Sequence, residues 1–377
     1  MRIALVHDWL NNFGGAERVL FQLHKIFPDA PIYTLFFDRS FVKKFLPKAD
    51  IRPSGLQKVP FIKKTYKFFF PFMPFCAESF DLSDYDTVVS SSVIFSKGLI
   101  LKPGTRHICY CYSPTRPLWD YHAEYARQNS NKFITALSSH LLRIWDRGAA
   151  DRVDEFAAIS ETVRARIKKY YRRDAKVIYP PLTIANNLET MAYGETFSSK
   201  QSAVVHSQLA ISGNYFLIVS RLYPHKNIDI AIEAFNKLGY NLIILGAGPI
   251  RKKLEKMAGE NIKFTGFQDE KTLINYYKNC KALIMPQEED FGLTALEAMS
   301  FGKPVLALRK GGATEIIKES ENGEFFDDPI PEALADGIRR LNENYQNYKP
   351  ELLKQRAAYF SESKFKDELF SLINRSQ

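Results

Sequence analysis

Residues 215–248, YFLIVSRLYPHKNIDIAIEAFNKLGYNLIILGAG, decide the fold class of this 377-residue chain. Two apolar runs, 215–220 and 240–246, flank a helix-like segment near 228–238. Both runs are apolar on each face, as strands are when helices cover both sides of a sheet. The stretch therefore predicts a β-α-β unit with parallel strands.

The same alternation of strand and helix continues in both halves of the chain. A chain of this length exceeds one ordinary hydrophobic core, so two domains are expected. We therefore predict an α/β protein with two doubly wound domains. Further strands are expected at 262–267, 281–286 and 304–308, and in the first half at 2–7, 31–36, 86–92, 106–112, 155–160 and 175–181. Helices are expected at 15–26, 131–150 and 161–171, and later near 250–258, 269–279, 293–301 and 313–319.

Changes in patterning place the boundaries of the two domains. Residues 183–213 are polar and lack clear periodicity, which is typical of a linker that carries an insertion. The first domain is then 1–182 and the second is 214–349. Residues 350–377 follow the second sheet and are expected to form one helix.

Composition narrows the classes of protein that fit. Hydrophobic residues make up 45% and charged residues 25%, which is typical of a globular chain. The four cysteines form no CxxC pair, which favours reduced thiols over a disulfide framework. The first apolar run is too short for a signal peptide, and no run reaches the length of a membrane-spanning helix. We therefore expect a cytoplasmic protein.

The net charge of +10 lies in the first half of the chain. Residues 1–182 hold 28 Lys and Arg against 17 Asp and Glu, whereas residues 183–377 hold 24 against 25. Such an excess indicates an anionic partner for the first domain, which could be a membrane surface, a lipid phosphate or nucleic acid.

The strongest functional pattern lies in MPQEEDFGLTALE, residues 285–297. A strand ends, an acidic loop follows, and a helix begins near Gly292, where glycine lets a ligand approach the backbone. The N–H groups of the first turn, at Phe291 to Thr294, then offer a site for a diphosphate. Glu289 lies before this helix and Glu297 about one and a half turns into it. Taken alone, each could be a surface glutamate that interacts with the helix dipole.

A second group of residues, SRLYPHKN (220–227), points to the same ligand. Arg221 and Lys226 lie on a loop at the carboxyl end of a parallel strand, where doubly wound sheets bind ligands. Both side chains suit phosphate oxygens, although an isolated pair in a loop is more often solvated. Together with the helix that begins at Gly292, they predict a phosphate clamp.

Several glycines and one aromatic extend the candidate site. Gly246 and Gly248 follow a strand, but Arg251 replaces the third glycine of a dinucleotide fingerprint, so a tight turn is the simpler interpretation. Gly14 and Gly15 in a strand-to-helix loop allow close approach of a phosphate or sugar, and this pattern is common in any such fold. Gly311 and Gly312 form a similar turn into a helix. The candidate binding residues also include Phe267 and Leu293.

Residues 58–75, KVPFIKKTYKFFFPFMPF, combine lysines with aromatics, and no acid occurs from Ile51 to Ala77. This composition suits insertion into the headgroups of an anionic bilayer. Alternatively the phenylalanines are core and the lysines solvated, or the segment stacks on single-stranded nucleic acid. No nucleic-acid-binding motif accompanies it, so we expect no nucleic-acid partner. The membrane-contact candidates are Lys58, Lys63, Lys64, Lys67, Phe68, Phe69 and Phe70.

The segment RHICYCYSPTRPLWDY, residues 106–121, combines a strand with a proline-bounded turn at its carboxyl end. This end of the strand is where a cleft is expected. The side chains that could reach it are His7, Asp8, Tyr112, Arg116 and Asp120. Metal binding is not expected, because the histidines are scattered and Asp84-Tyr85-Asp86 precedes its strand instead of following it.

Taken together, these motifs resemble family four of the glycosyltransferases. The resemblance rests on EDFGLTALE, SRLYPHKN, GGAERVL and GKPVLALRKGGATEII. HDWL, LSDYDTVVSSS, CYSPTRPLWD and KVIYPPL are similar to the bacterial branch with O-antigen and exopolysaccharide mannosyltransferases. The resemblance to family four covers nearly the whole chain apart from about 185–212.

The resemblance implies a GT-B fold, with two Rossmann-like domains facing a central cleft and a last helix that crosses back to the first domain. It implies sugar transfer with retention and without a metal or other cofactor. Arg221 and Lys226 would then bind the diphosphate, Glu289 the sugar hydroxyls and Glu297 the ribose. Relatives often have histidine where this chain has Tyr112, which cannot titrate near neutral pH.

The leading hypothesis is transfer of a hexose, with mannose from GDP-mannose preferred over a UDP-sugar, to a lipid-linked glycan. The protein would work on bacterial surface polysaccharide, peripherally associated with the inner face of the cytoplasmic membrane. Competing hypotheses are a non-catalytic glycan-binding scaffold, a nicotinamide dehydrogenase and a basic nucleic-acid binder.

Overall fold

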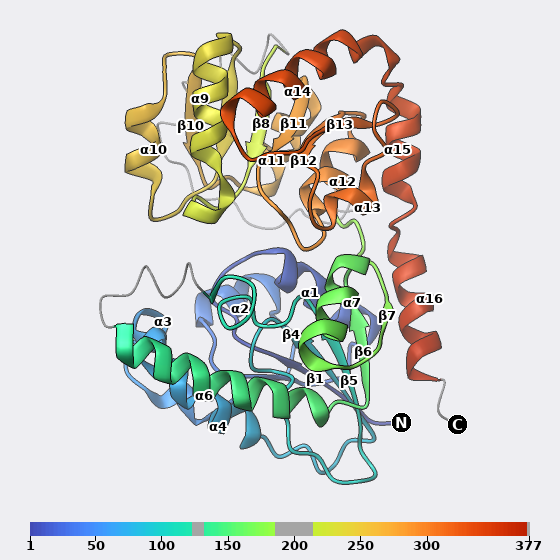
Figure 1. The fold of residues 1–377 in the computed structure, drawn as a ribbon. Coiled ribbons are helices and arrows are strands. Elements are labelled where there is room, and N and C mark those ends of the chain that lie inside the picture. Colours follow the sequence, from blue (N-terminus) through green and yellow to red (C-terminus); the bar gives the residue numbers. More distant parts are fainter. Residues whose placement is uncertain (123–131, 185–213, 375–377) are drawn as a thin grey trace. The chain divides into compact units, whose positions relative to one another are not determined.

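The computed structural model describes residues 1–122, 132–184 and 214–374, and its packing divides the chain into two compact units. Unit 1 comprises Met1–Pro180 with Phe365–Gln377, and unit 2 comprises Pro181–Lys364. The linker predicted at 183–213 lies outside the described residues except for its first two positions. Each unit contains one parallel sheet (Figure 1).

The sheet of unit 1 has seven parallel strands in the order β3-β2-β1-β4-β5-β6-β7. Val6 of β1 pairs with Tyr33 on one side and with Ser90 on the other, so β1 and β4 form the centre. All six strands predicted in this half are present. The strands are β1 (Ile3–His7), β2 (Ile32–Thr34), β3 (Ile51–Pro53), β4 (Thr87–Ser92), β5 (Arg106–Cys111), β6 (Glu155–Ala158) and β7 (Ala175–Val177).

The sheet of unit 2 has six parallel strands in the order β10-β9-β8-β11-β12-β13. This order reverses direction between β8 and β11, as the order of unit 1 does between β1 and β4. Such a reversal is the ligand-binding switch point of doubly wound sheets. The strands are β8 (Phe216–Val219), β9 (Leu242–Leu245), β10 (Ile262–Gly266), β11 (Ala282–Met285), β12 (Val305–Leu308) and β13 (Gly323–Phe326).

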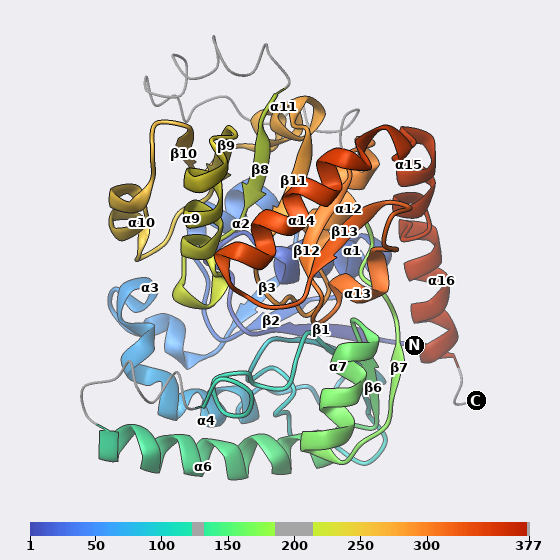
Figure 2. The ribbon, with the colours of Figure 1, turned by 45° about the horizontal axis from the view of Figure 1, so that its top comes forward.

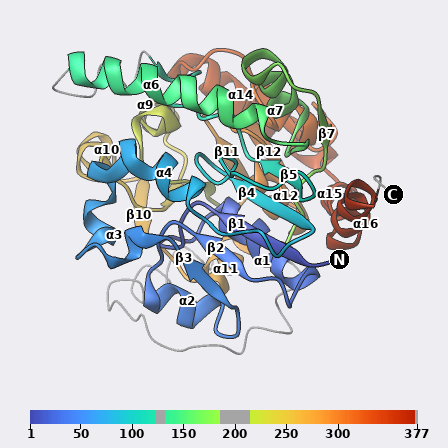
Figure 3. The same cartoon turned by 90° about the horizontal axis from the view of Figure 1, so that it is seen from below.

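Helices of unit 1 connect the strands. The short helices within residues 62–78 pack against the long helix α6. Leu142 of the long helix α6 lies in one core cluster with Ile62, Met73 and Ala77. Figure 3 shows α6 alongside α4 and near α3, an arrangement that this shared core explains. The helices are α1 (Gly15–Ile26), α2 (Arg39–Phe45), α3 (Ile62–Thr65), α4 (Met73–Glu78), α6 (Lys132–Asp151) and α7 (Glu161–Arg166), which continues as a π-helical turn over Ile167–Tyr171.

Helices of unit 2 cover both faces of its sheet. α9 packs against α14 and α10 on one face, while α12 packs against α11, α13 and α15 (Figure 2). The buried and apolar strands between these layers agree with the predicted parallel sheet. The helices are α9 (Ile228–Leu238), α10 (Arg251–Met257), α11 (Glu270–Asn279), α12 (Leu293–Ser300), α13 (Ala313–Ile316), α14 (Pro331–Glu343) and α15 (Pro350–Ala358).

The prediction of one helix over residues 350–377 was wrong, because the segment contains two. α15 ends at Ala358, and α16 runs from Glu362 to Ile373. The backbone between them has other partners, since the Phe360 carbonyl accepts from the Leu182 N–H at 2.8 Å. Ser361 then caps the new helix by accepting from the Lys364 N–H at 3.2 Å.

The end of α16 packs on unit 1, as the predicted crossover requires. The guanidinium of Arg106 donates to the carbonyls of Leu372, at 2.8 Å, and Ile373. The ring of Phe370 meets the ring of Phe27 edge-on, with centroids 5.5 Å apart. These contacts return the chain to the sheet with which it began.

Two strands were not predicted, and each is short and carries weak strand residues. β3 is Ile-Arg-Pro, and proline cannot donate to a sheet ladder, so it is tolerated at this edge. β13 begins at Gly323 with a buried glutamate beside it. Helices α2 and α14 were also missing from the prediction.

Candidate active site

The loops predicted to bind the donor meet at the switch point of unit 2. Residues 220–227 follow β8 and residues 286–292 follow β11, and these two strands are neighbours at the centre of the sheet. The Asn227 side chain donates to the Pro286 carbonyl at 3.1 Å, which ties the two loops together. Asn227 adopts the left-handed backbone conformation (φ 52°) that asparagine tolerates better than most residues.

Lys226 and Glu289 form an ion pair across these loops, with the Nζ atom 2.6 Å from Oε1. Lys226 is 8% exposed, so its charge lies in a poorly solvated position. Gln287 donates to the same Oε1 at 2.8 Å and was not among the predicted residues. Two of the three predicted catalytic residues are therefore brought into direct contact.

A third loop supports Glu289 from the side of β12. The Glu289 carbonyl accepts from the Gly312 N–H at 2.8 Å, and Glu289 forms an isolated bridge with Gly311. The glycine pair predicted at 311–312 therefore lies beside the acidic loop. This contact holds the backbone of Glu289 while its side chain faces Lys226.

Helix α12 begins at Gly292, whose φ of 111° is in the region that favours glycine. No side chain caps this helix start, and the half-buried Leu293 and Thr294 form its first turn. Phe291 is buried, and its ring packs edge-on against Phe360 with centroids 5.5 Å apart. The helix start predicted near Gly292 is confirmed, since Leu293 is the first helical residue, and an uncapped N-terminus is a site for anions.

Glu297 is buried in α12, where it accepts a hydrogen bond from the Tyr277 hydroxyl at 2.7 Å. Tyr277 lies on α11 and is itself fully buried. Sequence reasoning could not find this partner, because only the packing of α11 on α12 brings the two side chains together.

The glycine turn after β9 lies directly beside the first loop. A Cβ on Gly246 would stand 1.9 Å from the Ser220 carbonyl oxygen, so only glycine fits there. Beyond it, the Ala247 carbonyl accepts from Leu222 N–H at 3.0 Å and Gly248 precedes α10. Phe267, next to β10, is 73% exposed, and the exposed Arg221 guanidinium lies 5.7 Å from the Tyr223 ring centroid.

The switch point of unit 1 holds a different set of side chains. His7 Nδ1 lies 3.0 Å from Ser91 Oγ, and that hydroxyl lies 2.8 Å from the hydroxyl of Tyr112. Tyr112 donates to the Ala16 carbonyl at 2.9 Å, and His7 Nε2 lies 3.7 Å from a Glu17 carboxylate oxygen. These contacts attach the loop of Gly14 and Gly15, which begins α1, to strands β1, β4 and β5.

Burial raises the pKa of Tyr112 well above its usual value, so the tyrosine stays neutral in this network. It acts there as a hydrogen-bond donor and acceptor and not as an acid or base at neutral pH.

Asp8 has a structural role in unit 1. Its buried carboxylate accepts from the backbone N–H groups of Val93, Ile94, Phe95 and Ser96. One carboxylate therefore closes the whole loop after β4. Contact of Asp8 with an acceptor substrate stays a prediction.

Arg116 and Asp120 belong to a second group of charges, beside α7. Asp120 Oδ2 lies 3.0 Å from Arg166 Nε and 4.0 Å from Arg116 Nε. Tyr170 donates to the same carboxylate, which together with burial raises the tyrosine pKa to about 12. Arg166 and Tyr170 were not predicted, because they follow β6 and reach this place only through the fold.

The membrane-contact candidates divide between surface and core. Lys58, Lys64 and Lys67 are exposed, and Lys63 pairs with Asp38. Phe68 is 81% exposed, whereas Phe69 and Phe70 pack against the core cluster that contains Met73. Phe69 and Phe70 are therefore partly buried, and membrane contact by these three phenylalanines stays a prediction.

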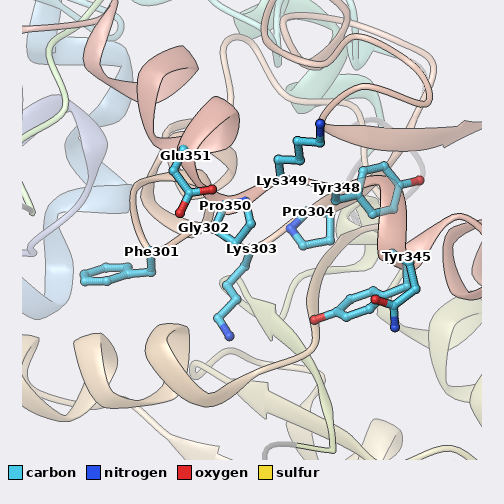
Figure 4. Close-up of a pocket in the computed structure, with 10 residues that line it drawn as sticks. Phe301, Gly302, Lys303, Pro304, Tyr345, Tyr348, Lys349, Pro350 and Glu351 are labelled. Atoms are coloured by element: carbon cyan, nitrogen blue, oxygen red, sulfur yellow. The ribbon is translucent and has the colours of Figure 1, made fainter.

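A hollow of about 390 Å³ lies elsewhere in unit 2 (Figure 4). It includes the loop before β12, at the amino edge of the parallel sheet, whereas the donor loops follow carboxyl ends. It is therefore separate from the candidate active site. Its lining includes Lys303, Tyr345, Tyr348, Lys349 and Glu351.

Within residues 1–122, 132–184 and 214–374, no cluster of three histidine, cysteine or acidic side chains has a geometry suited to a metal ion. Among the helices of those same ranges, none has both the length and the apolar character of a membrane crossing.

Comparison with known proteins identifies what this arrangement resembles. Residues 205–359 match the family described as glycosyl transferases group 1. An uncharacterized glycosyltransferase of Methanocaldococcus jannaschii, MJ1178, is 32% identical over 35% of this chain and 39% of the relative. A GDP-mannose-dependent phosphatidylinositol dimannoside mannosyltransferase of Mycobacterium tuberculosis is 30% identical over 47% of this chain and 49% of the relative. The chain thus matches less than half the length of these curated relatives.

A solved structure matches over the whole chain. The Anabaena protein Alr3699/HepE, in complex with UDP and glucose, has a TM-score of 0.72 at 18% identity, covering 99% of both chains. This likeness confirms the predicted GT-B fold. The family match and the curated relatives are all described as glycosyltransferases, and they leave the donor and acceptor open.

Proposed function

We propose that this chain is a retaining hexosyltransferase that uses a sugar nucleotide, with GDP-mannose as the preferred donor. The observation that carries the proposal is the Lys226–Glu289 pair at the switch point of unit 2, between the uncapped start of α12 and the turn at Gly246. The group 1 match over residues 205–359 covers all of these residues and lies within unit 2.

In the proposed reaction, the bond between the anomeric carbon and the diphosphate oxygen breaks, and the anomeric carbon bonds to the oxygen of an acceptor hydroxyl, whose proton passes to the leaving diphosphate. Negative charge develops on the leaving diphosphate. Lys226, Arg221 and the first-turn N–H groups of α12 stabilise this charge, so no metal ion is required in the proposal. A preorganised cation of this kind contributes most where water is scarce, and Lys226 is 8% exposed.

Glu289 holds the donor sugar in this proposal. Its carboxylate already binds Lys226 and Gln287, and a carboxylate has room for further donors such as sugar hydroxyls. The ion pair also keeps the ammonium of Lys226 beside the sugar when the diphosphate arrives. Glu297 accepts the ribose hydroxyls in addition to the hydroxyl of Tyr277.

The acceptor is proposed to be a lipid-linked glycan of bacterial surface polysaccharide synthesis, such as O-antigen or exopolysaccharide. The support is the charge excess of residues 1–182 and the exposed lysines and Phe68 of residues 58–75. A lipid-linked acceptor would keep the protein at the inner face of the cytoplasmic membrane as a peripheral protein.

A UDP-hexose is the second candidate donor. The similar Anabaena protein is described in complex with UDP and glucose, which supports a UDP-sugar for a chain of this fold. The mycobacterial relative, described as GDP-mannose-dependent, supports the first candidate.

The test is a donor panel assayed for nucleoside diphosphate release with the purified full chain. We expect turnover with GDP-mannose above UDP-glucose, product with the donor's anomeric configuration by NMR, and loss of turnover in Glu289→Ala. Glu332→Ala, a change at an exposed ion pair of the same unit, is the matched control. No turnover with any donor, or unchanged activity in Glu289→Ala, would contradict the proposal.

A further inference from the structure

Helix α6 presents an apolar face to solvent in unit 1. Leu137, Leu141 and Ile144 are 52%, 58% and 60% exposed. Their spacing of four and three residues places them on one side of the helix. Leu142 and Asp146 lie on its buried side. A helix that buries one face and still exposes a second apolar face indicates an interaction surface.

Helix α6 packs against a segment that has a second group of exposed apolar side chains. Trp145 of α6 donates to Glu78 of α4 at 2.9 Å, and Leu142 shares a core cluster with Ile62 and Met73. Figure 3 shows α4 alongside α6, and Ile62 of α3 belongs to the same core cluster as Leu142. The segment packed against α6 exposes Phe61 (80%), Phe68 (81%), Phe72 (60%) and Phe75 (68%).

Most charges of these elements are positive, and the acids at the ends of α4 and α6, Glu78 and Asp151, pair with Arg152 and Arg147. No acid occurs from residue 51 to residue 77, and Lys58, Lys64 and Lys67 are exposed there. Residues 132–150 contain one acid, Asp146, which is fully buried and pairs with Lys97 at 2.6 Å. Any partner of this region therefore meets apolar side chains and cations together.

We propose that the outer face of α6 and the exposed phenylalanines of residues 61–75 form one membrane-binding surface for an anionic lipid bilayer. The inference rests on the proposed lipid-linked acceptor and identifies how the enzyme reaches it. Separate phenylalanines enter the boundary between headgroups and acyl chains, while lysines meet anionic headgroups. α6 contributes insertion and the lysines of 58–67 contribute attraction.

The experiment measures co-sedimentation of the full chain with vesicles of phosphatidylcholine alone and of phosphatidylcholine with phosphatidylglycerol in equal parts. We expect binding to the anionic vesicles only. Leu141→Glu on α6 should weaken that binding about tenfold, because a half-exposed leucine loses its insertion and a charge replaces it. Phe72→Glu should do the same.

Leu352→Glu is the matched control, since Leu352 is 52% exposed on helix α15 of the other unit. It should bind vesicles as the unchanged chain does. Leu141→Trp keeps the face apolar, and its fluorescence should shift to the blue on anionic vesicles. Thermal melting of each variant shows whether the fold is retained.

Two results would overturn the inference. One is full binding to anionic vesicles by a folded Leu141→Glu variant, which would remove α6 from the surface. The other is no binding to either vesicle while Leu141→Glu abolishes self-association, which would make the face a protein interface. Binding of GDP-mannose by calorimetry separates the two proposals: vesicle binding that depends on Leu141 without any donor binding would leave this inference standing and remove the proposed function.

Discussion

The switch points of the two units share a strand order and differ in their electrostatics. In unit 2, the ion pair of Lys226 and Glu289 lies between loops that follow the central strands. In unit 1, His7, Ser91 and Tyr112 form a chain of hydrogen bonds at the corresponding place. The same strand order thus supports an ion pair between two loops in one unit and a chain of hydrogen bonds in the other.

This difference teaches which unit can stabilise a leaving anion. A buried cation lowers the energy of developing negative charge, whereas a hydrogen-bond network that already binds its own backbone serves mainly to fix loops. In unit 1 the network attaches the loop before α1 through the Ala16 carbonyl. Unit 1 has cations elsewhere, among them Lys97, which pairs with the buried Asp146, and Arg116 and Arg166 beside Asp120.

The largest effect on the contrast between the two units is expected from a substitution of Lys226. Lys226→Ala should lower kcat about 100- to 1,000-fold, because it removes one preorganised group from the leaving-group site. Initial rates of nucleoside diphosphate release measure the effect. Lys237→Ala, in which an exposed lysine of the same unit loses its pair with Glu332, should leave the rate unchanged. Equal losses in both variants would contradict a special role for Lys226.

A smaller effect is expected at the other end of the donor site. Glu297→Gln should raise the donor KM about 10- to 100-fold, because hydrogen bonds to a charged acceptor are worth about 1.5–3 kcal/mol. Tyr277→Phe removes the hydroxyl that donates to Glu297 and keeps the carboxylate. It should change KM less than Glu297→Gln does. If Tyr277→Phe has the larger effect, the glutamate is structural.

Unit 1 should account for part of the sensitivity to acid. Burial lowers the pKa of His107 from 6.5 to about 3, and its Nε2 lies 2.8 Å from Ser90 Oγ. Between pH 6.5 and about pH 3, His107 therefore binds a proton in the unfolded chain but not in the folded chain. The free energy of unfolding should fall as pH falls between these values, by about 1.4 kcal/mol per pH unit.

Urea unfolding of the full chain at several pH values measures this slope. His107→Gln removes the titrating group, so its unfolding free energy should depend less steeply on pH below 6.5. A variant with an unchanged slope would assign the acid sensitivity to other groups. Both curves should converge in slope above that pH, where the unfolded histidine is neutral as well.

The smallest effect is expected from removal of metal ions. Because Lys226 and Arg221 are proposed to supply the positive charge, EDTA should leave the rate of sugar transfer unchanged. The measurement is the initial rate before and after chelation. A loss of activity that Mg²⁺ or Mn²⁺ restores would show that a metal ion takes part, and would break the contrast between the two units.

Much of the candidate site could be predicted from local sequence. Glu289, Gly292 and Glu297 follow one strand in a fixed order, so their places at a loop and a helix start depend only on neighbouring residues. Arg221 and Lys226 follow another strand in the same way. Where the position of a residue depends on spacing along the chain, the predicted and observed positions agree.

Contacts between distant segments could not be predicted. Tyr277 meets Glu297 only because α11 packs on α12, and Arg166 meets Asp120 only because β6 lies next to β5. The burial of Phe70 against Phe95, with ring centroids 4.8 Å apart, is another example. A run of phenylalanines carries no periodic signal in a segment broken by prolines, so its outward and inward residues look alike in sequence.

The sequence by itself determined the two parallel sheets, the loops after β8 and β11 and the helix that begins at Gly292, because apolar runs, glycines and helix starts act over a few residues. Tertiary structure alone decided which charges meet, which aromatic side chains stay outside and where the final helix breaks. These outcomes depend on burial against segments that are far away in the chain, and burial sets both the cost of a charge and the exposure of an apolar face.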